Sequence, residues 1–386
     1  MSDDFKDWGF DQETELEKTI VRPMKTKKRE PELPEIPEPE PPKARVPLKK
    51  IVLGLLIAAA LLALALFFFR LGANTPAPDP KPDPTPAGPV EPEGPFYHPL
   101  TGVQIAEAPS GRMYCVSVDN SPEARPQSGV EAASLVYELP AEAHIPRLLL
   151  CYYNVNADVI GPVRSARPYI VDSARGWGGF FAHCGWSPEA EALLESGVVD
   201  YVNEIDYHDY FWRDDSRDAP HNLYTSTDLL AQAVDDFDYA EEQEVPSFSF
   251  RRDGELLAGE DGSWLDIEFE AESAAFIYDE ARRAYGRWVN DYEYKDSYTG
   301  NQVFAANVIV QFVSSRVLDE EGRLELDLTS GGDALLFTNG VLIRGSWTRS
   351  SLDEPTRFVD ENGEEFSLLP GQTWIEIVDE ADRISY

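Results

Sequence analysis

Residues 134–138 (SLVYE) and 147–153 (RLLLCYY) decide how the central part of this chain of 386 residues folds. Both are short runs of aliphatic, β-branched and aromatic side chains bounded by turn-forming residues, which is the pattern of a β-strand. Two more runs of this kind lie on either side of them, MYCVSV at 113–118 and GFFAHC at 179–184. We therefore expect these runs to be strands of one domain.

Three stretches with helical character lie between and after these strands, at 168–175, 188–195 and 227–238. The last follows Ser226, a residue type whose hydroxyl caps the first amide groups of a helix. An alternation of strands and helices predicts an α/β domain, which we place at residues 96–245.

After residue 245 the sequence changes to strand-like runs separated by turns rich in glycine and aspartate. These runs lie at 264–269, 274–279, 307–313, 334–340, 341–347 and 373–378. The segment DEARRAYGRW (279–288) has helical propensity, but we predict a hairpin there, with Tyr278 and Tyr285 on its two sides. We therefore expect a mainly β domain at residues 246–386, which makes the fold class of the two domains together α+β.

Upstream of these domains lies an uninterrupted apolar run, IVLGLLIAAALLALALFFF, from Ile51 to Phe69. At about 1.5 Å per residue it is about 28 Å long, enough to cross the hydrocarbon core of a membrane. We predict one transmembrane helix at residues 51–70. Basic residues are concentrated before the run, which places the N-terminus in the cytoplasm and the rest outside; they are Lys43, Arg45, Lys49 and Lys50.

The segments on either side of the apolar run are rich in proline and charge. Residues 1–50 cannot bury enough apolar surface to fold, so we expect a disordered cytoplasmic tail. Residues 71–95 contain nine prolines and predict an extended stalk that holds the folded part away from the bilayer.

Composition excludes some classes of function. The chain has 33 Lys and Arg against 70 Asp and Glu, and a net charge of −37 repels nucleic acid. Its three cysteines, Cys115, Cys151 and Cys184, are too few for a disulfide scaffold. No pair of cysteines or histidines has the spacing of a metal site, so we predict no metal and no cofactor.

Several polar motifs carry a resemblance to a known family. Examples are HPLTG (98–102), VDNSPEARPQSG (118–129), IGPVRSARPY (160–169), APHNLYTS (219–226) and LPGQTWIEIV (369–378). With these motifs, residues 96–386 closely resemble the YerB-like lipoprotein family, domain of unknown function 3048. The resemblance implies an exported, membrane-attached bacterial protein, and the family name records no activity. This chain has the apolar run in place of a lipidated cysteine.

Arginines are concentrated on turns of the first domain, although the protein as a whole is acidic. A guanidinium group is a planar fork of donors that suits carboxylate or phosphate. We therefore predict a cleft that binds an anionic component of the cell envelope. Its candidate residues are Asp119, Arg125, Arg147, Arg164, Arg167, His183, His221 and Asn222. The alternative is that these arginines pair with carboxylates and lock loops.

Two enzymatic alternatives stay open. The order of Asp119, the arginines and HCGWSPEAEALL (183–194) is similar to the LytR-CpsA-Psr glycopolymer transferases. That resemblance implies an envelope phosphotransferase in which arginines neutralise a pyrophosphate and Asp119 holds Mg²⁺. The other alternative is a Cys–His enzyme acting on peptidoglycan through Cys184. His183 would not be its base, because adjacent residues of a strand point to opposite faces.

The charge asymmetry around the apolar run generates a topology prediction. Protease added to intact cells should remove residues 70–386 and leave the N-terminal tail intact, as read with an epitope tag at each end of the chain. Permeabilised cells are the control, in which the tail should be digested too. Survival of the C-terminal tag in intact cells would contradict this orientation.

Overall fold

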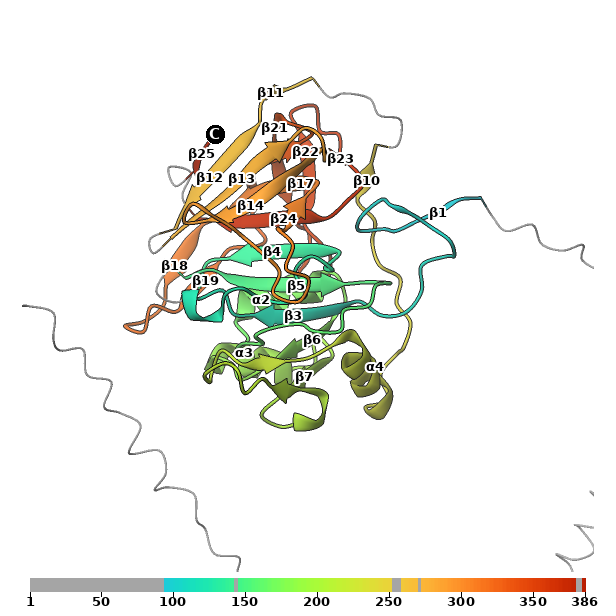
Figure 1. Ribbon diagram of the computed structural model, residues 1–386, viewed down its shortest axis with the longest axis vertical. Helices are drawn as coiled ribbons and strands as arrows, with labels where there is room; N and C mark the ends of the chain where they lie inside the picture. Colours follow the sequence, from blue (N-terminus) through green and yellow to red (C-terminus); the bar gives the residue numbers. More distant parts are fainter. Residues whose placement is uncertain (1–93, 142–144, 252–257, 270–271, 380–383) are drawn as a thin grey trace, which may run out of the picture. The chain divides into compact units, whose positions relative to one another are not determined.

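The computed structural model describes residues 94–141, 145–251, 258–269, 272–379 and 384–386, which are coloured in Figure 1. The tail predicted at 1–50, the transmembrane helix at 51–70 and nearly all of the stalk lie outside these residues. Within the described ranges, no helix is both long enough and apolar enough to span a membrane. All described residues belong to one compact unit, Pro89–Tyr386.

One long mixed sheet contains strands from both halves of the sequence (Figure 1). The first half supplies β3 (Tyr114–Val118), β4 (Leu135–Leu139), β5 (Arg147–Tyr152), β6 (Phe180–His183) and β7 (Tyr201–Asn203). The second half supplies β11 (Glu260–Asp261), β17 (Asn307–Phe312), β20 (Gly332–Thr338), β21 (Val341–Thr348), β22 (Arg357–Asp360) and β24 (Thr373–Val378). The strand order is β11-β21-β20-β17-β24-β4-β5-β3-β6-β7, and β22 pairs with β21. The runs predicted as strands thus form strands.

The two halves meet where β24 lies parallel to β4, with Glu376 opposite Glu138. Every residue of both strands is buried, as expected for strands that are covered on two faces. The segments predicted as separate domains, 96–245 and 246–386, therefore share one sheet. Their junction is a strand pairing between residues far apart in the chain, which no local sequence pattern marks.

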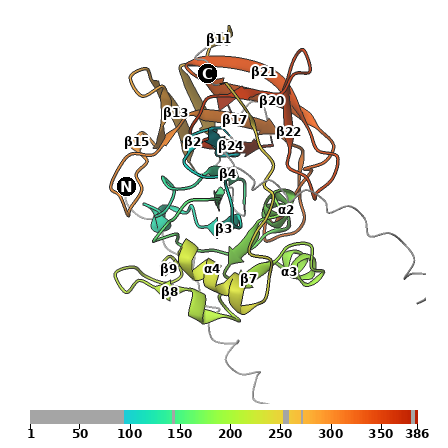
Figure 2. The same ribbon diagram turned by 90° about the vertical axis from the view of Figure 1, so that its right-hand side faces the viewer.

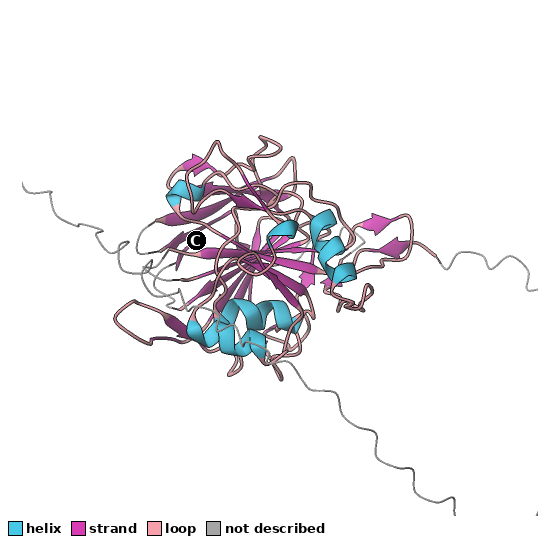
Figure 3. Cartoon of the chain, turned by 90° about the horizontal axis from the view of Figure 1, so that it is seen from below, coloured by secondary structure: helices cyan, strands magenta, loops and turns pink. Residues whose placement is uncertain are grey.

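Three helices flank the part of the sheet that the first half supplies: α2 (Pro168–Gly176), α3 (Pro188–Glu195) and α4 (Thr227–Asp236). Side chains of α2 and α3 belong to one apolar core and those of α4 to another, so the helices cover opposite faces of the sheet (Figures 2 and 3). Ser226 caps α4 as predicted, because its hydroxyl accepts a hydrogen bond from the Leu229 amide at 3.2 Å. The helix ends two residues earlier than predicted, where Asp238 turns the chain with a φ of 57°.

A second sheet has the order β15-β14-β13-β12-β25, and β16 pairs with β14. Its strands are β12 (Trp264–Glu268), β13 (Ser273–Asp279), β14 (Ala284–Val289), β15 (Tyr292–Glu293), β16 (Phe304–Ala305) and β25 (Ile384–Ser385). β13 and β14 form the predicted hairpin, with Tyr278 opposite Tyr285. The inner face of this sheet packs on the long sheet, since Phe276 and Trp374 belong to one apolar core.

Short strand pairs complete the fold. They are β1 (Phe96–Tyr97) with β2 (Gln104–Ile105), β8 (Trp212–Arg213) with β9 (Leu223–Tyr224), β10 (Ser249–Phe250) with β23 (Ser367–Leu368), and β18 (Ser315–Val317) with β19 (Leu324–Leu326).

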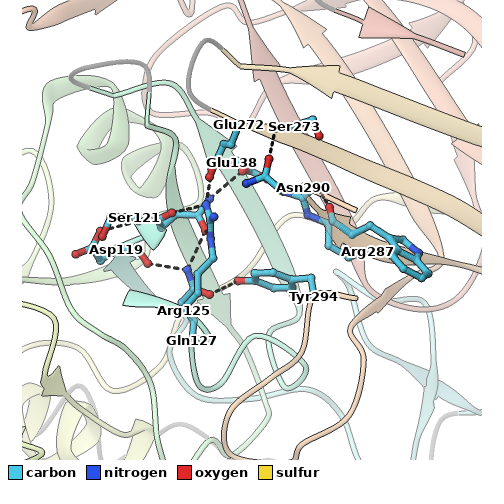
Figure 4. Close-up of polar contacts among 12 residues, drawn as sticks. Asp119, Ser121, Arg125, Gln127, Glu138, Glu272, Ser273, Arg287, Asn290 and Tyr294 are labelled. Carbon is cyan, nitrogen blue, oxygen red and sulfur yellow. Dashed lines mark hydrogen bonds and ion pairs between the residues drawn. The ribbon is translucent and has the colours of Figure 1, made fainter. Parts of the chain in front are cut away.

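Buried charged side chains lie between the two sheets (Figure 4). Arg287 of β14 forms an ion pair with Glu138 of β4, and neither side chain is more than 1% exposed. The Arg287 guanidinium also lies over the rings of Phe276 and Trp374, 4.7 and 5.1 Å from their centroids. Aromatic faces attract cations, so these rings help to hold the charge in the interior.

The charges of this buried group balance only if one carboxyl keeps its proton. Glu376 lies opposite Glu138, and Arg125 forms a further ion pair with Glu272, so three carboxyls face two guanidiniums. Burial raises the pKa of Glu376 well above its ordinary value, and the neighbouring Glu138 raises it further. Burial also raises the pKa of Glu138, against the opposing effect of Arg287. The pair of glutamates therefore keeps a proton.

This proton generates a prediction about stability. Because the pKa of Glu376 is raised in the folded state, its stabilising effect is present at low pH and is lost as pH rises through the folded-state pKa. The variant Glu376→Gln keeps the shape without the charge. Urea unfolding of the full chain in detergent, from pH 5 to pH 8, should show a smaller loss of stability with rising pH in this variant than in the wild type.

The matched control is Glu365→Gln, which removes an exposed carboxylate paired with Arg357 at 2.8 Å. It should leave the pH dependence in this range unchanged. Equal pH dependence of the wild type and Glu376→Gln would show that the glutamate pair does not hold a proton.

Candidate functional site

The strands β3, β6 and β7 run parallel, so their carboxyl ends meet at one edge of the long sheet. The residues that follow them are Asp119, Cys184 and Glu204. β5 runs antiparallel to β3 and begins at the same edge with Arg147. Open α/β sheets bind ligands at the carboxyl ends of their strands, which makes this edge the candidate site.

The segment 160–167 crosses this edge and brings Arg164 to Asp119. Backbone hydrogen bonds fix its course: the Asp119 amide donates to the Pro162 carbonyl at 2.9 Å, and the Arg164 amide donates to the Ser117 carbonyl at 2.8 Å. The Arg164 side chain then donates from Nε to Asp119 Oδ2 at 2.9 Å.

Asp119 is the centre of the polar contacts at this edge. His221 Nδ1 lies 2.8 Å from the Oδ2 atom that Arg164 also contacts, and the Ser121 amide donates to Oδ1 at 3.0 Å (Figure 4 shows Asp119 and Ser121). The Asp119 side chain is 5% exposed, whereas those of Arg164 and His221 are 29% and 20% exposed. A buried carboxylate thus orients two side chains that reach solvent.

Burial alone would raise the pKa of Asp119. The hydrogen bond from Ser121 and the charge of Arg164, with smaller contributions from His221 and Arg147, outweigh burial and hold this pKa below its ordinary value. Asp119 is therefore ionised at neutral pH.

The site does not suit Mg²⁺ in the role that the transferase resemblance implies. Both oxygens of Asp119 already accept hydrogen bonds from protein donors, while Mg²⁺ needs oxygen ligands in an octahedral shell. Within the described ranges, no three His, Cys, Asp or Glu side chains are grouped as a metal site.

Two more predicted arginines lie at the same edge. Arg147 donates from Nη1 to the Ser165 carbonyl at 3.0 Å, and Arg167 donates from Nη1 to the Ala166 carbonyl at 2.6 Å. Arg147 therefore contacts the segment that carries Arg164, and Arg167 is the last residue of that segment. From the predicted set, the structure thus brings together Asp119, Arg147, Arg164 and His221.

Arg125 and Asn222 have other partners. Arg125 forms an ion pair with Glu272 and donates from Nε to Asn120 Oδ1 at 3.2 Å, so it belongs to the buried group between the sheets (Figure 4). Asn222 follows His221 in the sequence, but its side chain has a different partner: its Oδ1 atom accepts a hydrogen bond from Arg213 Nη1 at 3.0 Å. These two residues position loops around the site.

His183 is a core residue. Its ring is fully buried and stacks on Phe181, with 5.1 Å between centroids, and Nδ1 donates to the Gly185 carbonyl at 2.9 Å. Burial lowers the pKa of His183 to about 4, so the ring is neutral at physiological pH. None of the described residues pairs with its Nε2 atom.

Cys184 faces a carboxylate that sequence reasoning missed. Its thiol donates to Glu204 Oε2 at 3.2 Å, and Glu204 also accepts from Arg213 Nη2 at 3.2 Å. Burial, together with Glu204, raises the pKa of Cys184 to about 12. A thiol that stays protonated is a poor nucleophile, which argues against the Cys–His alternative. Glu204 follows a strand of three residues, Tyr201–Asn203, too short to recognise by pattern.

Comparisons with known proteins agree on one family. The "Protein of unknown function (DUF3048)" N-terminal domain matches residues 100–240, and the C-terminal domain of the same description matches residues 265–375. A protein of Bacillus subtilis (strain 168) with the name "Putative lipoprotein YerB" is 35% identical over 294 residues, which are 74% of this chain and 87% of that protein. The crystal structure of the YerB protein from Bacillus subtilis matches with a TM-score of 0.69 at 34% identity and covers 75% of this chain and 98% of that one.

The contact between Cys184 and Glu204 generates a prediction about thiol reactivity. At pH 8 the Cys184 thiol of the full chain should react with iodoacetamide much more slowly than an ordinary exposed thiol, because little of it is thiolate. Replacing Glu204→Gln removes the negative charge that helps to raise the thiol pKa, so the rate should increase several-fold.

Intact-protein mass spectrometry counts the alkyl groups added, and Cys115 and Cys151 should stay unmodified because both are buried. The control is Glu195→Gln, an exposed carboxylate at the end of α3. Rapid alkylation of Cys184 in the wild type would restore the Cys–His alternative.

Proposed function

The chain belongs to the DUF3048 family of proteins of unknown function, and we propose that it is a membrane-associated envelope protein that binds an anionic ligand beside Asp119. The name of the relative, "Putative lipoprotein YerB", supports location at a membrane. In this chain the apolar run Ile51–Phe69 would supply the anchor, with the N-terminus in the cytoplasm and residues 70–386 outside.

The observation that carries the ligand proposal is the way Arg164 is held. Its Nε atom is fixed on Asp119, and none of the described residues accepts a hydrogen bond from its two terminal NH₂ groups. A guanidinium anchored in this way keeps a planar pair of donors for a ligand. Phosphate and carboxylate are the groups that match such a pair.

His221 extends the same arrangement. Its Nδ1 atom is engaged by Asp119, which leaves Nε2 as the ring nitrogen for a ligand. Arg147 adds positive charge near Asp119, where it helps to lower the pKa of that carboxyl. An anion here would gain charge-assisted hydrogen bonds of roughly 1.5–3 kcal/mol each.

One observation favours a second candidate, an envelope glycopolymer phosphotransferase. A carboxylate bonded to Nδ1 of a histidine fixes its tautomer and orients Nε2 as a general acid or base, as Asp119 does for His221. In that function the arginines would hold a phosphate-linked substrate while His221 moves a proton at Nε2. Replacing His221→Gln would then abolish turnover while most of the ligand affinity remains.

Arg164 could bind a ligand, or it could only hold its loop in place by pairing with Asp119 (a loop clamp). The variant Arg164→Lys distinguishes these two roles, because the first predicts a loss of ligand affinity and the second a loss of thermal stability. Lysine keeps the positive charge but lacks the planar fork, so a ligand site should lose about tenfold in affinity for pyrophosphate. Titration calorimetry on the full chain in detergent at low salt measures this loss. The melting temperature should stay within a few degrees of the wild type.

The matched control is Arg344→Lys, because Arg344 of β21 forms a surface pair with Glu260 of β11 at the opposite end of the long sheet. Its pyrophosphate affinity should equal that of the wild type. A large fall in melting temperature with unchanged affinity in Arg164→Lys would identify Arg164 as a loop clamp and reject the anion site.

A further inference from the structure

The outer face of the second sheet carries a row of apolar side chains. Trp264 lies opposite Ile277, Ile277 opposite Gly286, and Gly286 opposite Phe304, so these four positions share one face across four strands. With about 4.8 Å between strands, the row is about 14 Å long. Trp264 and Ile277 are 45% and 48% exposed. Trp288 lies on the same face, two residues from Gly286.

A hollow of about 720 Å³ lies in this face, lined by Ile277, Gly286, Trp288 and Phe304 among others. Gly286 lets two side chains of the lining pack directly on the strand. A Cβ atom there would stand 3.0 Å from Gln302 Nε2 and 3.2 Å from Phe304 Cε1, which is tighter than ordinary van der Waals contact. The backbone of Gly286 does not have the positive φ that would itself favour glycine. The missing side chain therefore makes room for Gln302 and Phe304, which line the hollow.

The rim of the hollow is polar, and its charges are matched. Arg282, the one cation among the described residues that line the hollow, donates to Asp279 at 2.6 Å, and its guanidinium lies over the ring of Phe304, 4.8 Å from the centroid. Beside the rim, Lys295 pairs with Glu293 at 3.1 Å. Each of these two cations thus already has an acid. An anionic polymer would find no unmatched cation among the described residues of the rim, and the protein's net negative charge would repel it.

Amide and carboxylate groups provide the remaining hydrogen-bonding capacity of the rim. Asn301 donates to Glu131 at 3.2 Å, and Gln302 donates to the Arg287 carbonyl at 3.2 Å, so both amides are held in place with oxygen atoms to spare. Flat aromatic rings beside fixed amides and carboxylates suit a ligand that is apolar on its ring faces and hydroxylated at its edges. Sugar rings have this character.

We propose that this face binds an uncharged glycan chain. Trp288 and Trp264 would stack on the C–H faces of sugar rings along the row, and the ring of Phe304, over which Arg282 already lies, would border them. The hollow beside these rings would accept a substituent of one sugar ring, and the rim amides and carboxylates would bond to hydroxyl groups. The row is longer than a single sugar ring, which favours a chain over a monosaccharide. This site is distinct from the anion site beside Asp119.

The test measures binding of the full chain in detergent to chitotetraose, an uncharged oligomer of N-acetylglucosamine, and to insoluble chitin, cellulose and peptidoglycan freed of anionic polymers. Titration calorimetry serves the soluble probe and cosedimentation the others. The wild type should bind at least one of them. Trp288→Ala should lose tenfold or more in affinity for that probe. Gly286→Leu should also weaken binding with every aromatic ring retained, because its side chain would displace Gln302 and Phe304 from the lining of the hollow.

The matched control is Trp212→Ala, which removes a tryptophan that is 36% exposed on β8, outside this sheet. It should bind like the wild type, and so should Arg164→Lys, which separates this proposal from the anion site. Melting temperatures identify any variant that is unfolded. No binding of the wild type to any of the four probes would overturn the proposal. So would self-association, measured by sedimentation, that Trp288→Ala abolishes, because the face would then belong to a second copy of the chain.

Discussion

The buried ion pair between Glu138 and Arg287 is the contact on which the arrangement of the two sheets depends. It joins β4 in the middle of the long sheet to β14 of the second sheet. Breaking such a pair by removing one partner typically costs about 3–5 kcal/mol, because it leaves a buried charge without a counterpart. Glu376 and the rings of Phe276 and Trp374 complete its surroundings, so the pair also fixes where β24 and the hairpin of β13 and β14 must lie.

This buried pair also supports the candidate site. Asn120 donates from Nδ2 to Glu138 Oε1 at 2.9 Å, and Gln127 donates to the Asp119 carbonyl at 2.9 Å. The residue next to Asp119 is therefore tied to the centre of the protein. Preorganisation of this kind lets a single carboxylate hold Arg164 and His221 without ordering a loop at the moment of binding.

Local patterns in the sequence were sufficient for the three helices and for the strands of five residues or more. The runs at 134–138 and 147–153 became β4 and β5, and the Ser226 cap and the hairpin between Tyr278 and Tyr285 were both found where expected. The pairing of β24 with β4 was not predictable, because it depends on the tertiary fold and no turn or spacing records it. The site was only partly predictable, because it also depends on contacts between distant parts of the chain. Asp119 and Arg164 came together as predicted. Arg125 did not join them, because it forms an ion pair with Glu272 from the other half of the chain.

The position of β24 determines when the long sheet can be completed during folding. Thr373–Val378 is the last long strand in the sequence, yet it occupies the middle of the sheet between β17 and β4. Contacts between residues so distant in the chain form slowly, since the intervening loop must close first. During synthesis, β24 cannot join the strands of the two halves until residues 373–378 have been made and have left the ribosome. A truncation near residue 370 would deprive both halves of their common strand.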